Sequence, residues 1–318
     1  MEQKAIESQK RILKQIRNHP VIVGQKLGFD KLTDIHNEWI KEMMFGKEDE
    51  TLQAHRGSYK TTCVSIALAL IMIIFPNDKI LFMRKTNADV LEVIAQVRKM
   101  LQSDFMRRLS FLIWGVEVEL EQVRSDCIVT NLAGADPRGT PQLVGMGTQA
   151  SITGKHFDRI FTDDIVNVED RTSKAERERT KTVYQELQNI KNRDGRIFNT
   201  GTPWHQDDAF TLMPPAKKYD CYSTGLIDKE TLEHIKKGMT SSLFSANYEL
   251  RHIASEDVIF AFPKKGEDAQ LVEQGLCHLD SAFYGEDYTA FTICAKHDGK
   301  YFLFGKCWRK HVDDCLDE

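Results

Sequence analysis

The sequence lacks the features that mark secreted, disulfide-bonded or membrane-spanning proteins. Its seven cysteines are an odd and scattered set without a Cys-x-x-Cys pair, and the polar residues 1–10 do not resemble a secretory signal. We therefore expect reduced thiols and not disulfides or zinc ligands. The longest apolar run, residues 63–76, is too short to span a bilayer comfortably, so it predicts a buried helix and no membrane partner.

The sequence also lacks an excess of positive charge. Its 318 residues carry a formal net charge of −4 at pH 7, which excludes a protein coated all over with nucleic acid, because phosphate binding needs local positive charge. Any contact with DNA must therefore be local. The basic clusters that offer such a contact are Arg171/Lys174/Arg177/Arg179/Lys181, Lys191/Arg193/Arg196, Lys236/Lys237 and Lys264/Lys265. A solvated helix or loop face is the commoner meaning of such runs.

Hydrophobic periodicity indicates a mixed α/β fold. Strands are expected at 51–54, 79–83, 127–131, 143–148, 159–162 and 196–199, alternating with helices at 60–75, 88–101 and 172–189. Such alternation predicts a mostly parallel sheet covered by helices on both faces. Ligands of these sheets bind beyond the carboxyl ends of the strands, where the chemically informative segments of this chain lie.

The first of these segments, Q-A-H-R-G-S-Y-K-T-T at 53–62, departs from the phosphate-binding loop GxxxxGK followed by Ser or Thr. Aligning Lys60 and Thr61 with that pattern puts Ala54 and Tyr59 where the two glycines belong. The context still fits, since an apolar strand precedes the segment and a long apolar helix follows it. In such loops, backbone N–H groups wrap the phosphates, the lysine reaches the outer ones, and the hydroxyl holds Mg²⁺.

Two further residues support a phosphate-binding loop. Gly57 supplies flexibility, and Arg56 adds a cation that grips phosphate through two hydrogen bonds. The alternative is that Lys60 only decorates the start of a helix, but the helix dipole disfavours a cation there unless an anion is bound.

The second segment, R-I-F-T-D-D-I at 159–165, ends an apolar strand with two carboxylates. The first, Asp163, can hold Mg²⁺ through water, and the second, Asp164, can orient or deprotonate an attacking water. A helix cap is the alternative role of such a pair.

The third segment, F-N-T-G-T-P-W-H at 198–205, also follows a strand. Its polar groups can sense an outer phosphate and pass that state to a neighbouring element, although Gly201 and Pro203 equally fit a simple turn. Arg84, at the end of another strand, is a candidate phosphate sensor or nucleic-acid contact, with a surface arginine as the alternative.

Together the three segments, with G-T-Q-A-S-I-T-G-K-H leading into the second, resemble the large terminase subunit of tailed bacteriophages, a motor that packages DNA into preformed capsids. The likeness covers about 32–308, and a departing phosphate loop is usual in that family. The roles that the resemblance implies are nucleotide binding by Arg56, Gly57, Ser58, Tyr59, Lys60, Thr61 and Thr62, catalysis by Asp164, Lys60 and Arg56, Mg²⁺ binding by Thr61 and Asp163, and coupling by Thr200, Gly201 and Thr202.

The resemblance also implies an order of domains. We expect a helical segment at 1–45, a P-loop ATPase core at 46–206, a lid or linker at 207–261, and the start of a ribonuclease H-like α/β domain at 262–318. In that nuclease Asp280, within L-D-S-A at 279–282, would bind Mg²⁺ or Mn²⁺. The later acidic strands are missing, so we interpret the nuclease as incomplete, through a truncated chain or an interrupted gene.

The implied function is an ATP-hydrolysing motor that moves double-stranded DNA into a procapsid in the host cytoplasm. Its implied partners are the small terminase subunit, the capsid portal and further copies of the chain in a ring, one of which usually supplies an arginine to each site. One alternative is a two-lobed helicase, which requires a second ATP-binding lobe. The other is an assembly module that binds nucleotide without hydrolysing it.

Overall fold

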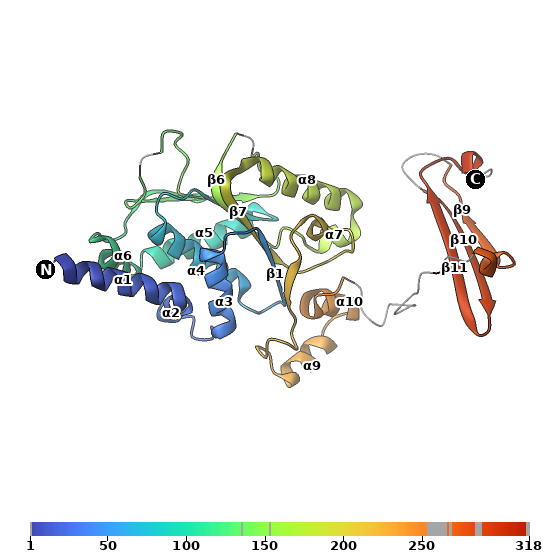
Figure 1. The fold of residues 1–318 in the computed structure, drawn as a ribbon, viewed down its shortest axis with the longest axis horizontal. Helices are drawn as coiled ribbons and strands as arrows, with labels where there is room; N and C mark the ends of the chain where they lie inside the picture. The colour runs from blue at the N-terminus through green and yellow to red at the C-terminus, as the bar shows by residue number, and fades with distance from the viewer. Residues whose placement is uncertain are drawn as a thin grey trace. The chain divides into compact units, whose positions relative to one another are not determined.

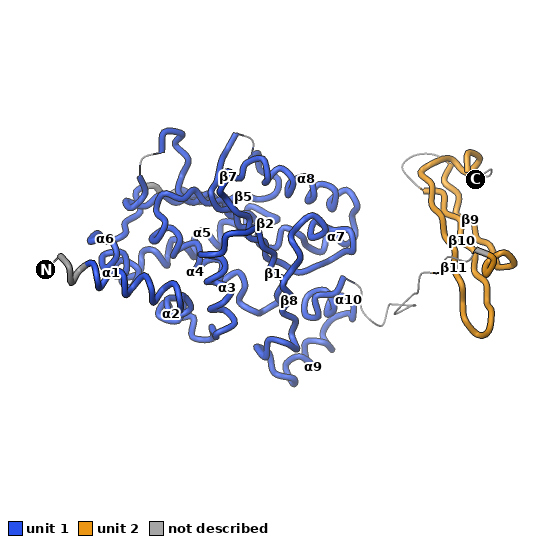
Figure 2. Tube along the Cα trace, in the orientation of Figure 1, with its two compact units in different colours: residues 1–259 blue, residues 260–318 orange. Residues whose placement is uncertain are grey.

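The computed structural model describes residues 2–134, 136–152, 154–252, 266, 269–283 and 288–315. The chain divides into two compact units, residues 1–259 and 260–318 (Figure 2). Lys264 and Lys265, with the neighbouring residues 262, 263, 267 and 268 at the expected domain boundary, lie outside the described residues. Among the described helices, none combines the length and apolar character that a membrane span requires.

The described strands of unit 1 form one eight-stranded sheet in the order β3-β4-β5-β2-β6-β7-β1-β8. Their bounds are β1 Glu50–Ala54, β2 Ile80–Arg84, β3 Leu120–Arg124, β4 Cys127–Thr130, β5 Leu143–Gly147, β6 Phe157–Asp163, β7 Lys191–Gly201 and β8 Ala216–Tyr219. All pairs from β5 to β8 are parallel, while β3 and β4 form an antiparallel edge. The mostly parallel sheet predicted from the sequence is confirmed.

Helices cover this sheet on both sides (Figure 1). Their bounds are α1 Glu2–Asn18, α2 Val21–Lys26, α3 Asp34–Phe45, α4 Lys60–Ile74, α5 Asn87–Leu101, α6 Asp104–Trp114, α7 Val168–Thr172, α8 Lys174–Ile190, α9 Lys229–Lys237 and α10 Ser241–Phe244. Helix α4, expected at 60–75, is buried along most of its length, as its apolar sequence predicts.

Alternate residues of the strands divide the core into two layers, because successive side chains of a strand point to opposite faces. Phe82, Phe161 and Phe198 pack with the helices from α1 to α6. Their neighbours Leu81 and Ile160 pack on the other face with side chains of α8. Both faces of the central strands are therefore buried, which explains their nearly continuous apolar sequences.

The structure differs from the sequence expectation at several elements. The helix expected at 172–189 is α8, and the short helix α7 that ends just before it was not expected. The two are separate because Ser173 is extended and its hydroxyl accepts a hydrogen bond from the Glu176 N–H to start α8. Helix α6 and the edge strands β3 and β8 were not expected. Strand β8 lies within the segment 207–261 and pairs with β1, so that segment contributes directly to the main sheet.

Unit 2 is a three-stranded antiparallel sheet in the order β11-β10-β9. Its strands are β9 Leu276–Asp280, β10 Thr289–His297 and β11 Lys300–Trp308. Asp280 is the last residue of β9 and is exposed.

The two-layer core makes a prediction about stability. Replacing the fully buried Phe82 by alanine should lower the free energy of unfolding of unit 1 by about 3–5 kcal/mol, because the change removes apolar contacts and leaves a cavity. Equilibrium urea unfolding followed by tryptophan fluorescence measures this change. Phe111→Ala, at a 54% exposed phenylalanine of α6, is the matched control and should change stability by less than about 0.5 kcal/mol. Equal effects of the two substitutions would contradict the assigned core.

Candidate nucleotide-binding site

The three segments singled out in the sequence meet at one edge of the sheet. They follow β1, β6 and β7, which are neighbours in the sheet and parallel, so their carboxyl ends lie side by side. A cleft of about 460 Å³ opens at this edge. It is lined by Arg56, Gly57, Ser58, Tyr59, Lys60, Thr61, Thr62, Asp164, Val166, Asn167, Thr202, Trp204 and Asn247.

The loop between β1 and α4 keeps a glycine-like backbone although the expected glycines are missing. Tyr59, at the second glycine position, has φ 61° and ψ 18°, which is the left-handed conformation. This conformation costs a side-chain-bearing residue about 1–2 kcal/mol. Packing supports it, since the Tyr59 ring contacts the main core and lies 5.9 Å edge-on from the His36 ring. Tyr59 therefore replaces the glycine of the phosphate-binding pattern but keeps the left-handed backbone turn.

Two buried histidines hold the loop through its carbonyl groups. His36 accepts a hydrogen bond from the Thr33 N–H at Nδ1, so its Nε2–H donates to the Ser58 carbonyl at 3.0 Å. His55 donates from Nδ1 to the Arg56 carbonyl at 3.0 Å, and its Nε2 accepts from the Thr224 hydroxyl. Burial lowers the pKa of both histidines, which keeps them neutral in these roles.

The cleft carries cations where a phosphate group would lie. Lys60 is the first residue of α4 and is 8% exposed, with its Nζ 3.5 Å from Asp164 Oδ2. The first turn of α4 has no acidic residue, so the positive end of the helix dipole is not balanced by a side chain of its own. Arg56 is exposed beside it. This end of the cleft is suited to an anion.

Asp163 is fully buried behind the cleft and receives hydroxyl hydrogen bonds from both sides. The Thr61 hydroxyl donates to its Oδ2 at 2.9 Å, and the Thr200 hydroxyl donates to its Oδ1 at 2.6 Å. Burial raises the pKa of Asp163, and the negative charge of Asp164 acts in the same direction, whereas Arg84 and Lys60 oppose the shift. The Asp163 side chain therefore interacts with residues of all three segments: Thr61 and Thr200 through hydrogen bonds, and Asp164 through its charge.

Asp164 faces the cleft in a less buried position. Its side chain is 31% exposed and its backbone has a positive φ of 48°, held by a hydrogen bond from its N–H to the Thr200 carbonyl. A Cβ on Gly201 would meet Asp164 Oδ1 at 3.4 Å and Phe210 Cζ at 3.0 Å. A side chain at position 201 would therefore press on the Phe210 ring and touch the carboxylate, which gives the glycine a steric reason.

Oxygen donors of this set fit a magnesium ion. Mg²⁺ is usually held by one or two carboxylates and by the phosphates of its substrate, and Asp163 and Thr61 offer a carboxylate and a hydroxyl within hydrogen-bond distance of each other. Over the described part of the chain, no three His, Cys, Asp or Glu side chains gather in a way that would hold a metal by themselves. Asp163 and Thr61 would therefore be two of the ligands, and water or a bound nucleotide would supply the others. Asp280 of unit 2 has no described acidic cluster around it.

Several contributors to the site gave little signal in the sequence. Asn247 lines the cleft from a π-helical turn, Ser245–Glu249, and its carbonyl accepts a hydrogen bond from the Arg56 N–H at 2.8 Å. His36 acts from α3, well before the loop it supports. Arg84 was noted only for its place at a strand end, and its contacts with both carboxylates required the fold.

Comparisons with known proteins found similar structures but no similar sequences. No protein-family model and no curated protein matches the chain. The large terminase of a thermophilic bacteriophage, in complex with ATP-gamma-S, has a TM-score of 0.46 and 12% identity, over 85% of this chain and 67% of that one. The ATPase domain of a large terminase from a Thermus phage has a TM-score of 0.46 and 11% identity, over 67% of this chain and 92% of that one. Similarity this low establishes no family, so function must follow from the residues of the site.

The histidine supports predict a pH dependence of stability. Because the folded-state pKa of His36 is lowered, the unfolded chain binds its proton first, and stability present above about pH 6.5 is lost as pH falls. His36→Gln keeps an N–H donor and removes the titration, so it should lose less stability than the wild type between pH 7.5 and pH 5.5 in urea unfolding. His234→Gln, at an exposed position of α9, is the control and should behave like the wild type. An unchanged pH dependence in His36→Gln would refute this role.

Proposed function

We propose that this chain is an ATP-hydrolysing motor that translocates double-stranded DNA, of the kind that packages phage genomes. The observation that carries the proposal is the single cleft in which the loop cation Lys60 lies 3.5 Å from Asp164, next to the buried Asp163. A phosphate-binding loop facing two carboxylates across one cleft is the arrangement that nucleoside triphosphate hydrolysis requires.

The residues present define how a nucleotide would be held. The N–H groups of the loop and of the first turn of α4 bind phosphate oxygens, and Lys60 reaches the outer phosphates. Arg56 is exposed at the same end and adds a second cation. A magnesium ion held by Thr61 and Asp163 would neutralise charge that develops on the phosphates.

Asp164 is the proposed catalytic base. Its carboxylate faces the cleft and is partly solvated, so it accepts a hydrogen bond from a water molecule aligned with the outermost phosphorus. The water oxygen forms the new bond to phosphorus, its proton passes to Asp164, and the bond from phosphorus to the bridging oxygen of ADP breaks. Lys60 stays close enough to stabilise the negative charge on the transferring group.

Thr200 and the segment after β7 are the proposed coupling path. The Thr200 hydroxyl contacts Asp163 and its carbonyl contacts the Asp164 N–H, so a shift of either carboxylate acts on β7. Thr202 continues this path along the cleft wall. The hydrogen bond from the Arg56 N–H to the Asn247 carbonyl ties the phosphate-binding backbone to the segment 207–261. We propose that the helical part of this segment after β8 moves as a lid, while β8 stays in the main sheet.

Double-stranded DNA, a small terminase subunit, a capsid portal and neighbouring copies in a ring are proposed partners inside the host cell. No surface is assigned to them, and several cations of the 171–181 cluster already have partners: Arg179 pairs with Glu176, and Lys181 pairs with Glu178 and Asp207. For unit 2 we propose the beginning of a nuclease domain, supported by an antiparallel sheet whose first strand ends at Asp280.

Phosphate release from Mg·ATP, with and without double-stranded DNA, tests this function. Asp164→Asn should lower the rate about 10²–10⁴-fold while nucleotide still binds, because it removes the base and keeps the shape. Asp163→Ala should abolish magnesium-dependent hydrolysis, and Lys60→Ala should weaken nucleotide binding at least tenfold. Asp126→Asn, at an exposed carboxylate paired with Arg124, is the matched control and should keep the wild-type rate.

The assays need high protein concentration and DNA, because a site completed by a neighbouring copy is slow in isolated chains. Equal rates for the wild type and Asp163→Ala would remove the assignment. Tight nucleotide binding without turnover under all conditions would favour the non-hydrolysing assembly module. Within the described residues unit 2 offers an antiparallel sheet and no second parallel lobe, so no observation favours the helicase.

Removal of the metal gives an independent prediction. Chelation of divalent ions with EDTA should abolish hydrolysis in the wild type, and excess Mg²⁺ should restore it. Titration of Mg·ATP and of ATP with EDTA in a calorimeter should show weaker binding without the metal, since Thr61 and Asp163 then contribute less. Hydrolysis that persists in EDTA would contradict the assigned magnesium site.

A further inference from the structure

Arg84 contacts both carboxylates of the site. It is the last residue of β2, which lies beside β6 in the sheet, and its side chain is 17% exposed. Its Nε lies 3.2 Å from Asp163 Oδ2, and its Nη2 lies 3.5 Å from Asp164 Oδ2. Lys60 reaches only Asp164 among these two. Among the described cations, Arg84 is therefore the one paired with the carboxylate proposed to hold the metal.

The geometry of these contacts indicates that Arg84 is held weakly at Asp163, so that another cation can replace it there. A guanidinium bound firmly to a carboxylate usually forms two parallel hydrogen bonds, whereas Arg84 gives one nitrogen to each of two carboxylates. The Nε contact with Asp163 is an ion pair without the angle of a hydrogen bond. Asp163 Oδ2 also accepts the Thr61 hydroxyl, so the oxygen and hydroxyl proposed to bind the metal both lie beside the guanidinium.

The charges around Arg84 nearly balance. Two carboxylates stand against two cations, Arg84 and Lys60, so these four side chains together are close to neutral when both acids are ionised. A divalent cation on Asp163 would place two further positive charges beside the guanidinium. Because like charges repel at such short distances in a partly buried site, the metal and the guanidinium would each weaken the other's binding to Asp163.

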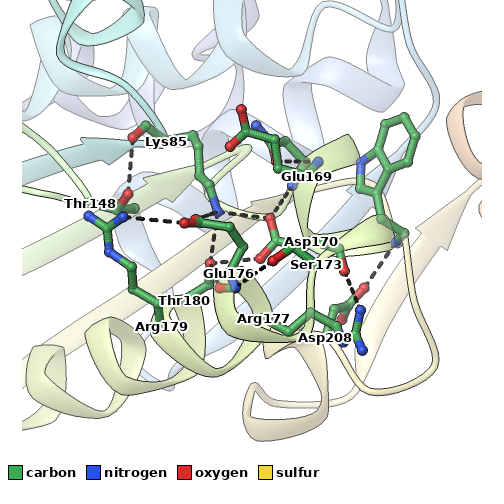
Figure 3. A network of polar contacts seen from close by, with 12 residues as sticks. Lys85, Thr148, Glu169, Asp170, Ser173, Glu176, Arg177, Arg179, Thr180 and Asp208 are labelled. Atoms are coloured by element: carbon green, nitrogen blue, oxygen red, sulfur yellow. Dashed lines mark hydrogen bonds and ion pairs between the residues drawn. The ribbon is translucent and has the colours of Figure 1, made fainter.

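The backbone around Arg84 is fixed, which leaves its side chain as the part that can move. The Arg84 carbonyl accepts the Thr148 N–H at 3.1 Å. The next residue, Lys85, is buried, and its Nζ donates to Asp170 Oδ2 and to the Thr180 hydroxyl, both at 2.9 Å (Figure 3). The Thr148 hydroxyl in turn donates to the Lys85 carbonyl at 3.0 Å.

We propose that the Arg84 guanidinium competes with the divalent metal for Asp163, holding both carboxylates while the cleft is empty and releasing Asp163 when the metal binds. Arg84 thereby sets the metal affinity of the site and prevents its two acids from repelling each other in the empty state. This proposal rests on the proposed function for the identity of the metal site, and it concerns an event that precedes hydrolysis.

Binding of Mn²⁺ alone, without nucleotide, tests the proposal in the full chain. Free Mn²⁺ is counted by electron paramagnetic resonance at pH 8, where protons compete little for the carboxylates. Arg84→Gln removes the charge and keeps a polar side chain of similar length, and should tighten Mn²⁺ binding about tenfold or more. Arg84→Lys keeps the charge and should stay within about threefold of the wild type. Asp163→Ala should abolish this binding in the Arg84→Gln background.

Arg124→Gln is the matched control, since it makes the same charge change at a 64% exposed arginine of unit 1 and should leave Mn²⁺ affinity unchanged. A thermal melt of each variant establishes that it is folded. Unchanged or weaker Mn²⁺ binding by Arg84→Gln, or binding that survives Asp163→Ala, would overturn the proposal. If ATP is not hydrolysed but the affinity shift is found, only the proposed function fails; if hydrolysis is found without the shift, only the role of Arg84 fails.

Discussion

The buried carboxylate of Asp163 is the interaction on which the rest of the site depends. It lies in the interior of unit 1, where a lone negative charge would be strongly unfavourable, and it is stabilised there by hydroxyl groups and cations from other elements. Thr61 reaches it from the start of α4, Thr200 from β7 and Arg84 from β2. Satisfying one charge thus fixes the relative positions of four elements at the edge of the sheet.

The cleft combines groups that suit an anion with groups that suit a cation. The loop before α4 presents cations and helix N–H groups suited to an anion, while the ends of β6 and β7 present a carboxylate pair suited to a cation. Lys60 and Arg84 pair with the two aspartates, so the two sets of charges largely neutralise each other. A nucleotide with its metal carries both kinds of charge, so the pair would replace both sets of contacts and should bind more tightly than either component alone.

Neighbouring charged networks stabilise the structure without lining the cleft. Lys85, next to Arg84 in the chain, turns to Asp170 at the start of α7 and to Thr180 of α8. Asp170 also accepts a hydrogen bond from the Asn167 N–H, and Asn167 lines the cleft. Consecutive residues of one strand therefore serve two purposes: Arg84 faces the site, and Lys85 fixes the loop that forms its wall.

The sequence by itself determined the alternation of strands and helices, the place of α4 and the three polar segments at strand ends, because these follow from local periodicity and from short motifs. It did not predict β8, the His36 support or the Asn247 carbonyl, since edge strands and backbone contacts leave no periodic signal. Helix α6 was missed although Met106, Leu109 and Ile113 are buried at helical spacing after the capping residue Ser103. The pairing of Arg84 with Asp164 joins residues 80 positions apart and exists only because β2 and β6 are neighbours in the sheet. Strand order is decided by the packing of the whole core, and so the tertiary structure alone determined which charges meet.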